Sequence, residues 1–185
     1  MSPIKVGYLV GSIARDSINL KLAKAIAKIG TQYNLELSHI PINELPLYSY
    51  DYDAEFPNVA QVFKASVESS QALIFVTPEY NRSIPGVLKN ALDWGSRPWG
   101  SNSFAGKPGA VIGASPGTLG TALAQQHLRN VLSYLDVHTL SQPEGYIQYT
   151  PDLVSPQGDI TDPGTADFLD RWVQAVAQYF EKAVS

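Results

Sequence analysis

Residues 72–77 read ALIFVT, an uninterrupted apolar run that ends at Pro78. Six residues rich in branched and aromatic side chains, closed by a proline, predict a short strand that is buried on both faces. Strands of this kind belong to parallel sheets, because the helices that connect parallel strands pack on both sides of the sheet. The stretch therefore predicts an α/β protein.

The hydrophobic pattern on either side of this run alternates between strand and helix. The expected strands are residues 4–10, 35–40, 72–77, 109–113 and 137–140. The expected helices cover about residues 22–30, 58–70, 87–92, 119–135 and 165–184. Five strands that alternate with five helices predict a three-layer, doubly wound parallel sheet of flavodoxin-like order 2-1-3-4-5. We expect a single domain that spans residues 1–185.

The composition narrows the classes of function. A net charge of −4 argues against partners such as nucleic acids or anionic membranes. The chain has no cysteine, which excludes disulfides and thiolate sites and fits a cytoplasmic location. Neither a secretory signal nor a membrane-spanning run is predicted. His39, His127 and His138 lie far apart in the sequence, so no metal site is expected.

Three loops rich in glycine, serine, proline and asparagine follow the first, third and fourth expected strands. They comprise residues 11–19, 78–86 and 114–120. In a parallel sheet of this order, ligands bind beyond the carboxyl ends of the strands, where the strand order reverses. The sequence therefore predicts that these three loops form one binding site.

The first loop reads GSIARDSIN and opens into a helix. Ser12, Ser17 and Asn19 offer donors to a phosphate, and the first amides of the helix add more. Arg15 supplies a guanidinium that binds phosphate oxygens in bidentate fashion. Since neither a Walker motif nor G-x-G-x-x-G is present, a monophosphate fits best. The alternative, in which Ser17 or Asn19 only caps the helix and Arg15 is solvated, stays open.

The second loop is stiffened by Pro78 and Pro85, while Asn81 and Gly86 tolerate turn conformations. A stiff loop with outward amides and one aromatic ring is suited to hold a planar heterocycle by its polar edge. The alternative is a proline-bounded turn in which Tyr80 only covers the core.

The third loop contains GASPG, which matches the G-x-S-x-G nucleophile elbow of serine hydrolases around Ser115. In such an elbow the amide after the serine donates to the oxyanion, but here that residue is Pro116, which has no N–H. Losing one oxyanion donor costs about 3 kcal/mol in the barrier. His127 and His138 also follow the serine too closely for the usual order of the triad. A hydrolase is therefore the weaker alternative.

Several segments together resemble the NADPH-dependent FMN reductases, and within them the branch that reduces chromate, quinones and azo dyes. The matching segments are GSIARDSIN (11–19), LPLY (45–48), TPEYN (77–81), SIPGVLKNALDW (83–94), AGKP (105–108) and HLRNVLSYLDV (127–137). They follow one another over nearly the whole chain. Two positions depart from the family pattern: Arg82 stands where many relatives have Tyr or His, and Gln126 where close relatives often have an aromatic residue.

The resemblance implies an FMN site that is made by all three loops. The residues it assigns are Ser12, Arg15, Ser17, Ile18 and Asn19 for the phosphate; Pro78, Glu79, Tyr80, Asn81 and Arg82 for the isoalloxazine ring; and Ser115 and Gly117 for the pyrimidine side of the ring. No protein residue is expected to be catalytic, because the flavin carries the chemistry. The resemblance also implies a homodimer or homotetramer, with the helix from Leu88 to Trp94 near the two-fold contact.

The function expected from these observations is a ping-pong transfer of hydride from NADPH or NADH through FMN to a small acceptor. Quinones, azo compounds and chromate are the expected acceptors. A flavodoxin-like electron carrier, which would bind FMN without oxidising NADPH, is the main alternative. The modest net charge of −4 favours the enzyme, because carrier flavodoxins are usually far more acidic.

Overall fold

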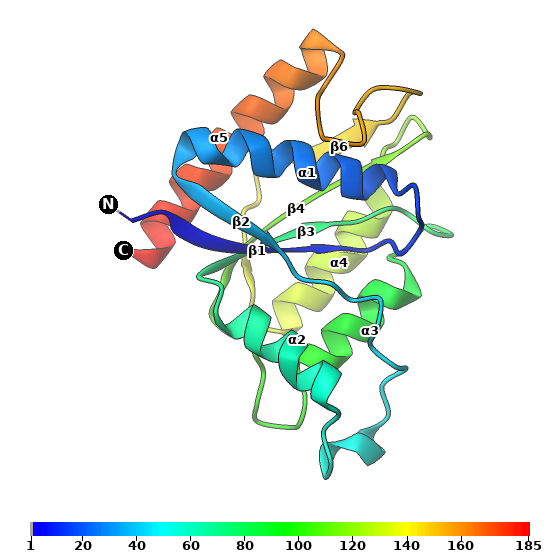
Figure 1. Ribbon diagram of the computed structural model, residues 1–185, viewed down its shortest axis with the longest axis vertical. Helices are drawn as coiled ribbons and strands as arrows, with labels where there is room; N and C mark the ends of the chain where they lie inside the picture. The colour runs from blue at the N-terminus through cyan, green and yellow to red at the C-terminus, as the bar shows by residue number, and fades with distance from the viewer. Residues whose placement is uncertain (1) are drawn as a thin grey trace.

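The computed structural model describes residues 2–185, which form one sheet with helices on both faces (Figure 1). All strand pairs are parallel, and the order along the sheet is β2-β1-β3-β4-β5, with β6 also paired to β4. The strands are β1 (Ile4–Val10), β2 (Leu35–His39), β3 (Ala72–Val76), β4 (Pro108–Ser115), β5 (His138–Thr139) and β6 (Gly145–Gln148). The predicted flavodoxin-like order is confirmed.

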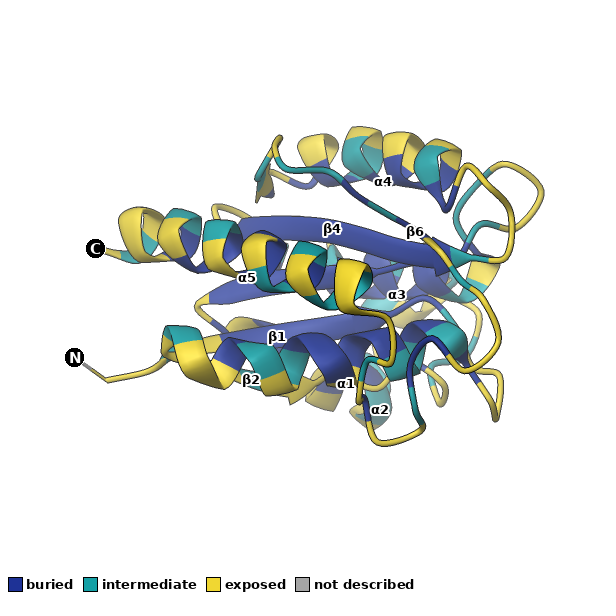
Figure 2. Cartoon of the chain, turned by 90° about the horizontal axis from the view of Figure 1, so that it is seen from above, coloured by how far each residue is buried: buried dark blue, intermediate teal, exposed yellow. Residues whose placement is uncertain are grey.

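The helices form the two outer layers. They are α1 (Ile18–Gly30), α2 (Asn58–Glu68), α3 (Gly86–Gly95), α4 (Ala122–Tyr134) and α5 (Pro163–Val184), with the short 3-10 helices η1 (Thr31–Tyr33) and η2 (Tyr50–Asp53). Helices α1 and α5 cover one face, and α2, α3 and α4 cover the other. Figure 2 shows the central strands buried between the two layers, as the apolar run at residues 72–77 predicts.

Each face of the sheet has its own hydrophobic core. Beneath α1 and α5, alternate residues of the strands, such as Ile74 and Ile112, pack against Trp172 and Phe180. On the other face, Phe75 packs with the apolar sides of α2, α3 and α4. Since side chains alternate between the faces of a strand, β3 contributes to both cores and holds the two layers together.

The structure corrects the sequence analysis at two elements. The fifth position of the sheet holds two short strands, because β5 pairs with the start of β4 and β6 pairs with its end. Pro143 lies between them and has no N–H for a ladder. Helix α4 begins at Ala122 rather than Leu119, because the preceding residues form a turn in which the N–H of Gly120 donates to the carbonyl of Gly117. Gly120 has φ of +57°, outside the helical region.

The loops that follow β1, β3 and β4 gather at one edge of the sheet, and both termini lie at the opposite edge (Figure 1). Within residues 2–185, no helix combines the length and the apolar character needed to cross a lipid bilayer.

Gly113 in β4 marks a place where the sheet tolerates no side chain. A Cβ at this position would lie 2.0 Å from the carbonyl oxygen of Thr77 and 2.3 Å from Oγ1 of Thr121. We expect Gly113→Ala to lower the free energy of unfolding by about 3 kcal/mol, because the backbone must move. Urea denaturation of the apoprotein measures this loss. Gly86→Ala is the matched control, since a Cβ there meets nothing within 4 Å; equal stabilities of the two variants would contradict the prediction.

Candidate functional site

A cavity of about 200 Å³ lies where the three predicted loops meet, beyond the carboxyl ends of β1, β3 and β4. The first loop contributes Ser12, Ala14, Asp16, Ser17, Ile18 and Asn19; the second contributes Pro78, Glu79 and Tyr80; the third contributes Ala114, Ser115 and Pro116. Because these loops are far apart in the sequence, only the sheet topology brings them to one cavity.

The first loop presents unpaired backbone donors at the start of α1. Ser17 is the N-cap of this helix, and its Oγ accepts a hydrogen bond from the N–H of Leu20. Within the described chain, the N–H groups of Ile13, Arg15 and Asp16 form no hydrogen bond. Free amides beside a helix N-terminus bind anions, so the loop has the donor set of a phosphate site.

The side chain of Asn19 is fully engaged with the sheet. Its Nδ2 donates to the carbonyl of Ala114 and its Oδ1 accepts from the N–H of Ala114, both at 2.9 Å. The side chain is only 1% exposed. Asn19 therefore fixes the first loop against the end of β4.

The first loop has a cationic neighbour besides the predicted Arg15. Arg15 is exposed, and Lys21, one turn into α1, forms an ion pair of 2.6 Å with Asp16. The hydrogen bond to Asp16 raises the pKa of Lys21. A second cationic group, the ammonium of Lys21, thus stands beside the loop.

The second loop is a tight two-residue turn. Tyr80 and Ser83 exchange backbone hydrogen bonds of 2.9 and 3.0 Å. Asn81 and Arg82 between them have φ of 51° and 67°, which is the pattern of a type I′ turn. In the described part of the chain the N–H groups of Asn81 and Arg82 have no hydrogen-bond partner. The turn therefore presents two outward donors next to the cavity, as its composition predicts.

Glu79 lies at the start of this turn, and its side chain is largely buried. One carboxylate oxygen accepts from the N–H groups of Leu123 and Ala124, at 3.0 and 3.1 Å. The other oxygen is 3.7 Å from the guanidinium of Arg82. The carboxylate thus connects the second loop to the first turn of α4.

The third loop lacks the geometry of a hydrolase. Oγ of Ser115 accepts from the N–H of Gly117 at 3.2 Å, and Ser115 has no positive φ of the kind found in a strained elbow. Nδ1 of His127 lies 3.0 Å from Oγ of Ser83 instead. Among residues 2–185 no histidine forms a hydrogen bond with Ser115. Together with Pro116, these contacts leave Ser115 without a base and with one oxyanion donor fewer.

Eight of the twelve predicted cofactor residues line the cavity: Ser12, Ser17, Ile18, Asn19, Pro78, Glu79, Tyr80 and Ser115. Arg15, Asn81, Arg82 and Gly117 lie on the same three loops but outside its lining. The other four lining residues, Ala14, Asp16, Ala114 and Pro116, were not predicted from the sequence, because none of them has a side chain that a phosphate or a flavin ring requires. Only their position in the loops between a strand and the next element points to them.

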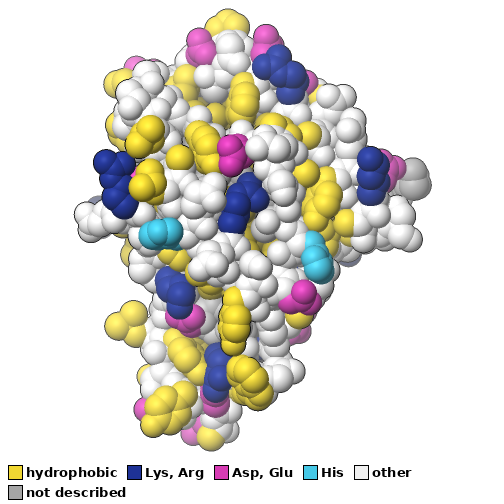
Figure 3. Space-filling model, turned by 180° about the vertical axis from the view of Figure 1, so that it is seen from behind, with side chains coloured by type: hydrophobic (Ala, Val, Ile, Leu, Met, Phe, Trp, Pro, Cys, Tyr) yellow, Lys and Arg dark blue, Asp and Glu magenta, His cyan; other side chains and the backbone are white. Residues whose placement is uncertain are grey.

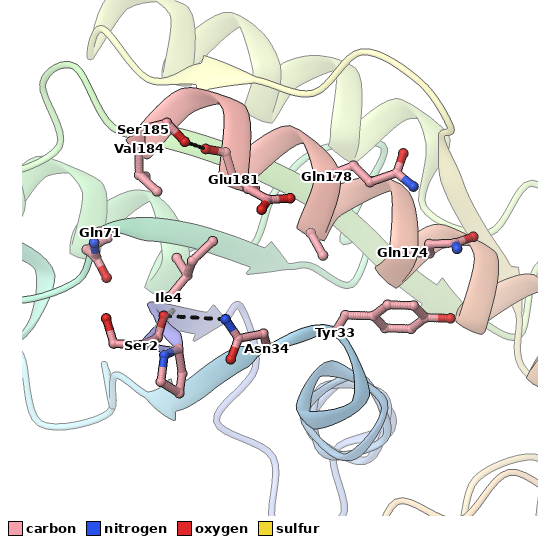
Figure 4. Close-up of a pocket in the computed structure, with 12 residues that line it drawn as sticks. Ser2, Ile4, Tyr33, Asn34, Gln71, Gln174, Gln178, Glu181, Val184 and Ser185 are labelled. Carbon is pink, nitrogen blue, oxygen red and sulfur yellow. Dashed lines mark hydrogen bonds between the residues drawn. The ribbon is translucent and has the colours of Figure 1, made fainter.

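A larger cavity of about 500 Å³ lies at the opposite edge of the sheet, near both termini (Figure 4). Its polar lining includes Asn34, Gln71, Gln178 and Glu181. It lies at the amino ends of the strands, away from the switch point at which ligands bind in sheets of this kind. We therefore assign the functional site to the smaller cavity.

With this geometry established, comparisons with known proteins identify the family. Residues 4–152 match the family model described as NADPH-dependent FMN reductase. A 2-hydroxy-1,4-benzoquinone reductase from Burkholderia sp. is 47% identical over 176 residues, which cover 95% of this chain and 96% of the relative. A quinone reductase from Pseudomonas putida is 40% identical over 94% of this chain and 93% of its own length. The chain belongs to the NADPH-dependent FMN reductase family.

A solved structure agrees with this membership. The protein described as FerB, a flavoenzyme NAD(P)H:(acceptor) oxidoreductase from Paracoccus denitrificans, is 43% identical to this chain. The two structures superpose with a TM-score of 0.92 over 97% of this chain and 98% of that one. The resemblance derived from the sequence motifs is thus confirmed at the level of the family.

Asn19 provides a direct test of how the site is held together. We expect Asn19→Ala to lower the free energy of unfolding by about 2–4 kcal/mol, because it leaves both the N–H and the carbonyl of Ala114 buried without partners. Urea denaturation of the apoprotein gives this value. Asn130→Ala, an exposed change on α4, serves as the control. A loss below about 1 kcal/mol for Asn19→Ala would show that water or a neighbour replaces the pair.

Proposed function

We propose that the protein is an FMN-dependent oxidoreductase that takes electrons from NADPH or NADH and passes them to small acceptors, quinones above all. The observation that carries this proposal is the cavity between the three loops, whose rim holds free backbone donors in a chain of the NADPH-dependent FMN reductase family. The two relatives described above are both named as reductases of quinones. Azo compounds and chromate are further candidate acceptors.

The residues of the three loops fit the parts of FMN. The free amides at Ile13, Arg15 and Asp16 suit the phosphate, with the cation of Arg15 nearby. The outward amides of the turn at Asn81 and Arg82 suit the polar edge of the ring. Bound FMN would supply the two-electron chemistry between nicotinamide and acceptor.

The protein's own part in the reaction is to bind FMN and the two substrates and to orient them. The third loop offers the ring fewer free backbone donors than the second loop does. Pro116 has no N–H, and the N–H of Gly117 already donates to Ser115. The donors that remain to offset negative charge on the ring are therefore the amides of Asn81 and Arg82. Since Tyr80 is 53% exposed, the site is open on this side, which suits planar acceptors that bind in turn after the nucleotide. We propose that this exchange follows a ping-pong scheme.

Two measurements on the purified protein test this function. Apoprotein titrated with FMN should bind it, and anaerobic NADPH should then bleach the oxidised-flavin band. Initial rates with NADPH and a benzoquinone should give the parallel double-reciprocal lines of a ping-pong scheme. Tight FMN binding without bleaching by NADPH or NADH would instead identify an electron carrier, and the proposed activity would be wrong.

A substitution at Arg15 tests the contact with the FMN phosphate independently of the contacts with the ring. We expect Arg15→Ala to weaken FMN binding about tenfold, because one charge-assisted hydrogen bond is worth about 1.5–3 kcal/mol. Riboflavin, which lacks the phosphate, should bind the variant and the wild type equally. Arg171→Ala is the control, since Arg171 is an exposed cation on α5. Equal losses for FMN and riboflavin would place the phosphate elsewhere. Fluorescence titration measures the affinities of the three proteins for FMN and for riboflavin.

We also propose that the protein is a cytoplasmic homodimer whose contact lies beside α3. Leu47, Tyr50 and Trp99 are 83%, 76% and 80% exposed. The segments that carry them are joined by the ion pair of Asp53 with Arg97. Figure 3 shows hydrophobic side chains on the narrow end of the molecule that carries η2. Exposed apolar groups close together mark interaction surfaces.

In the helix expected near the two-fold contact, two apolar residues face the interior of the protomer. Leu88 and Trp94 are fully buried within the protomer, and Nε1 of Trp94 donates to the carbonyl of Pro46 at 2.7 Å. Trp94 holds the loop that carries Leu47, and neither Leu88 nor Trp94 offers a surface to a partner. The contact would therefore use this loop and the segment after α3.

Trp99 tests the proposed dimer. We expect Trp99→Asp to convert the dimer to a monomer, because a buried, unpaired carboxylate in the contact is costly. Sedimentation velocity at micromolar protein concentrations measures the change. Tyr134→Asp, at an exposed aromatic residue on α4, is the matched control and should leave the dimer intact. A wild-type protein that sediments as a monomer would contradict the proposed assembly.

A further inference from the structure

The second loop is attached to helix α4 at two points. Oε2 of Glu79, at the start of the turn, accepts from the N–H groups of Leu123 and Ala124. Oγ of Ser83, at the end of the turn, lies 3.0 Å from Nδ1 of His127. The turn is thus held against one helix on both sides. Its two outward amides gain a fixed direction from these contacts, since the turn itself is only two residues long.

Helix α4 depends on Glu79 for its capping. The residue at its N-cap position, Thr121, makes no side-chain hydrogen bond to the first turn, and its hydroxyl accepts from Nε2 of Gln125 instead. The first N–H groups of a helix have no partner within the helix and need one outside it. The carboxylate of Glu79 comes from another loop and supplies that partner for two of them.

The negative charge of Glu79 also lies close enough to the cavity to affect a molecule bound there. Glu79 lines the cavity, and its side chain is only 10% exposed, so water screens it weakly. The N-terminus of α4 compensates part of the negative charge. Arg82 is 3.7 Å away but is itself 67% exposed, so it offsets less. A net negative potential therefore remains at the cavity wall.

We infer that Glu79 is a positioning residue that attaches the second loop to α4, and that its charge makes bound FMN harder to reduce. This inference rests on the proposed placement of FMN in the cavity. FMN gains negative charge when it takes electrons, so a fixed carboxylate at the wall disfavours the reduced form. The two parts of the role are separable, because a glutamine can accept the same hydrogen bonds without the charge.

The same contacts argue against Glu79 as a direct ligand of the ring. One oxygen is occupied by two amides of α4, and the other faces Arg82. A carboxylate is an acceptor only, so it cannot replace the donors that a reduced ring requires. The ring contacts in this loop therefore come from the backbone, and Glu79 acts through it.

Three variants separate the two parts. Glu79→Gln keeps the acceptor and removes the charge, while Glu79→Ala removes both. Glu36→Gln, on the exposed edge strand β2, removes one charge far from the cavity and is the matched control. Hydrogen exchange at Leu123 and Ala124 in the apoprotein reports the contact with α4 without any flavin. Titration with FMN and an equilibrium redox titration report the effect on the cofactor.

The attachment predicts that Glu79→Ala speeds exchange of the Leu123 and Ala124 amides at least tenfold and weakens FMN binding about tenfold. Glu79→Gln should change the affinity for oxidised FMN by less than threefold. It should also raise the affinity for reduced FMN, relative to that for oxidised FMN, at least threefold. For a two-electron couple this corresponds to a midpoint potential about 14 mV more positive.

Each failure has a distinct meaning. Unchanged amide exchange in Glu79→Ala would overturn the attachment to α4, whether or not FMN binds. A potential of Glu79→Gln equal to that of Glu36→Gln would overturn the electrostatic part. If wild type binds no FMN, the proposed function fails and the electrostatic part falls with it. The exchange experiment still decides the attachment in that case.

Discussion

The carboxamide of Asn19 forms with Ala114 the same pair of hydrogen bonds that neighbouring strands exchange, although β1 and β4 are separated in the sheet by β3. A side chain from the first turn of α1 thereby reaches across the end of β3 to the end of β4. Residues 95 positions apart become fixed relative to each other. The sheet topology brings the first and third loops to one cavity, and this pair fixes the distance between them. The turn between Tyr80 and Ser83 completes the third wall.

Much of the fold follows from local patterns. The run at residues 72–77 indicates a strand buried on both faces, and β3 is fully buried. The stripe of Leu169, Trp172, Val173, Val176 and Phe180 indicates the inner side of α5, and all five side chains are buried. These predictions succeed because burial repeats with the period of the element. The sheet order then follows from the alternation of elements and the handedness of their connections.

The features that sequence reasoning missed are those in which a residue acts on a distant partner. Asn19 is a residue type that suits a phosphate donor or a helix cap, and nothing nearby in the sequence indicates a contact with Ala114. Glu79 stands in a loop of turn-forming residues, but its partners are amides of α4, 44 and 45 residues later. Strand β6 is four residues long and follows Pro143, so it lacks the length that makes a pattern significant. Such contacts depend on the assembled sheet.

The C-terminal position of α5 has a consequence for the synthesis of this chain. Ile74 and Ile112 face Trp172 and Phe180, so the part of this sheet face that α1 does not cover stays exposed until α5 has been synthesised. At about 5–20 residues per second, synthesis from Ser115 to Val184, the end of α5, takes roughly 3–14 s. During that interval four parallel strands can already pair while the apolar surface that α5 later covers meets water. The nascent protein thus passes through a stage in which chaperones have a binding surface that the finished protein no longer shows.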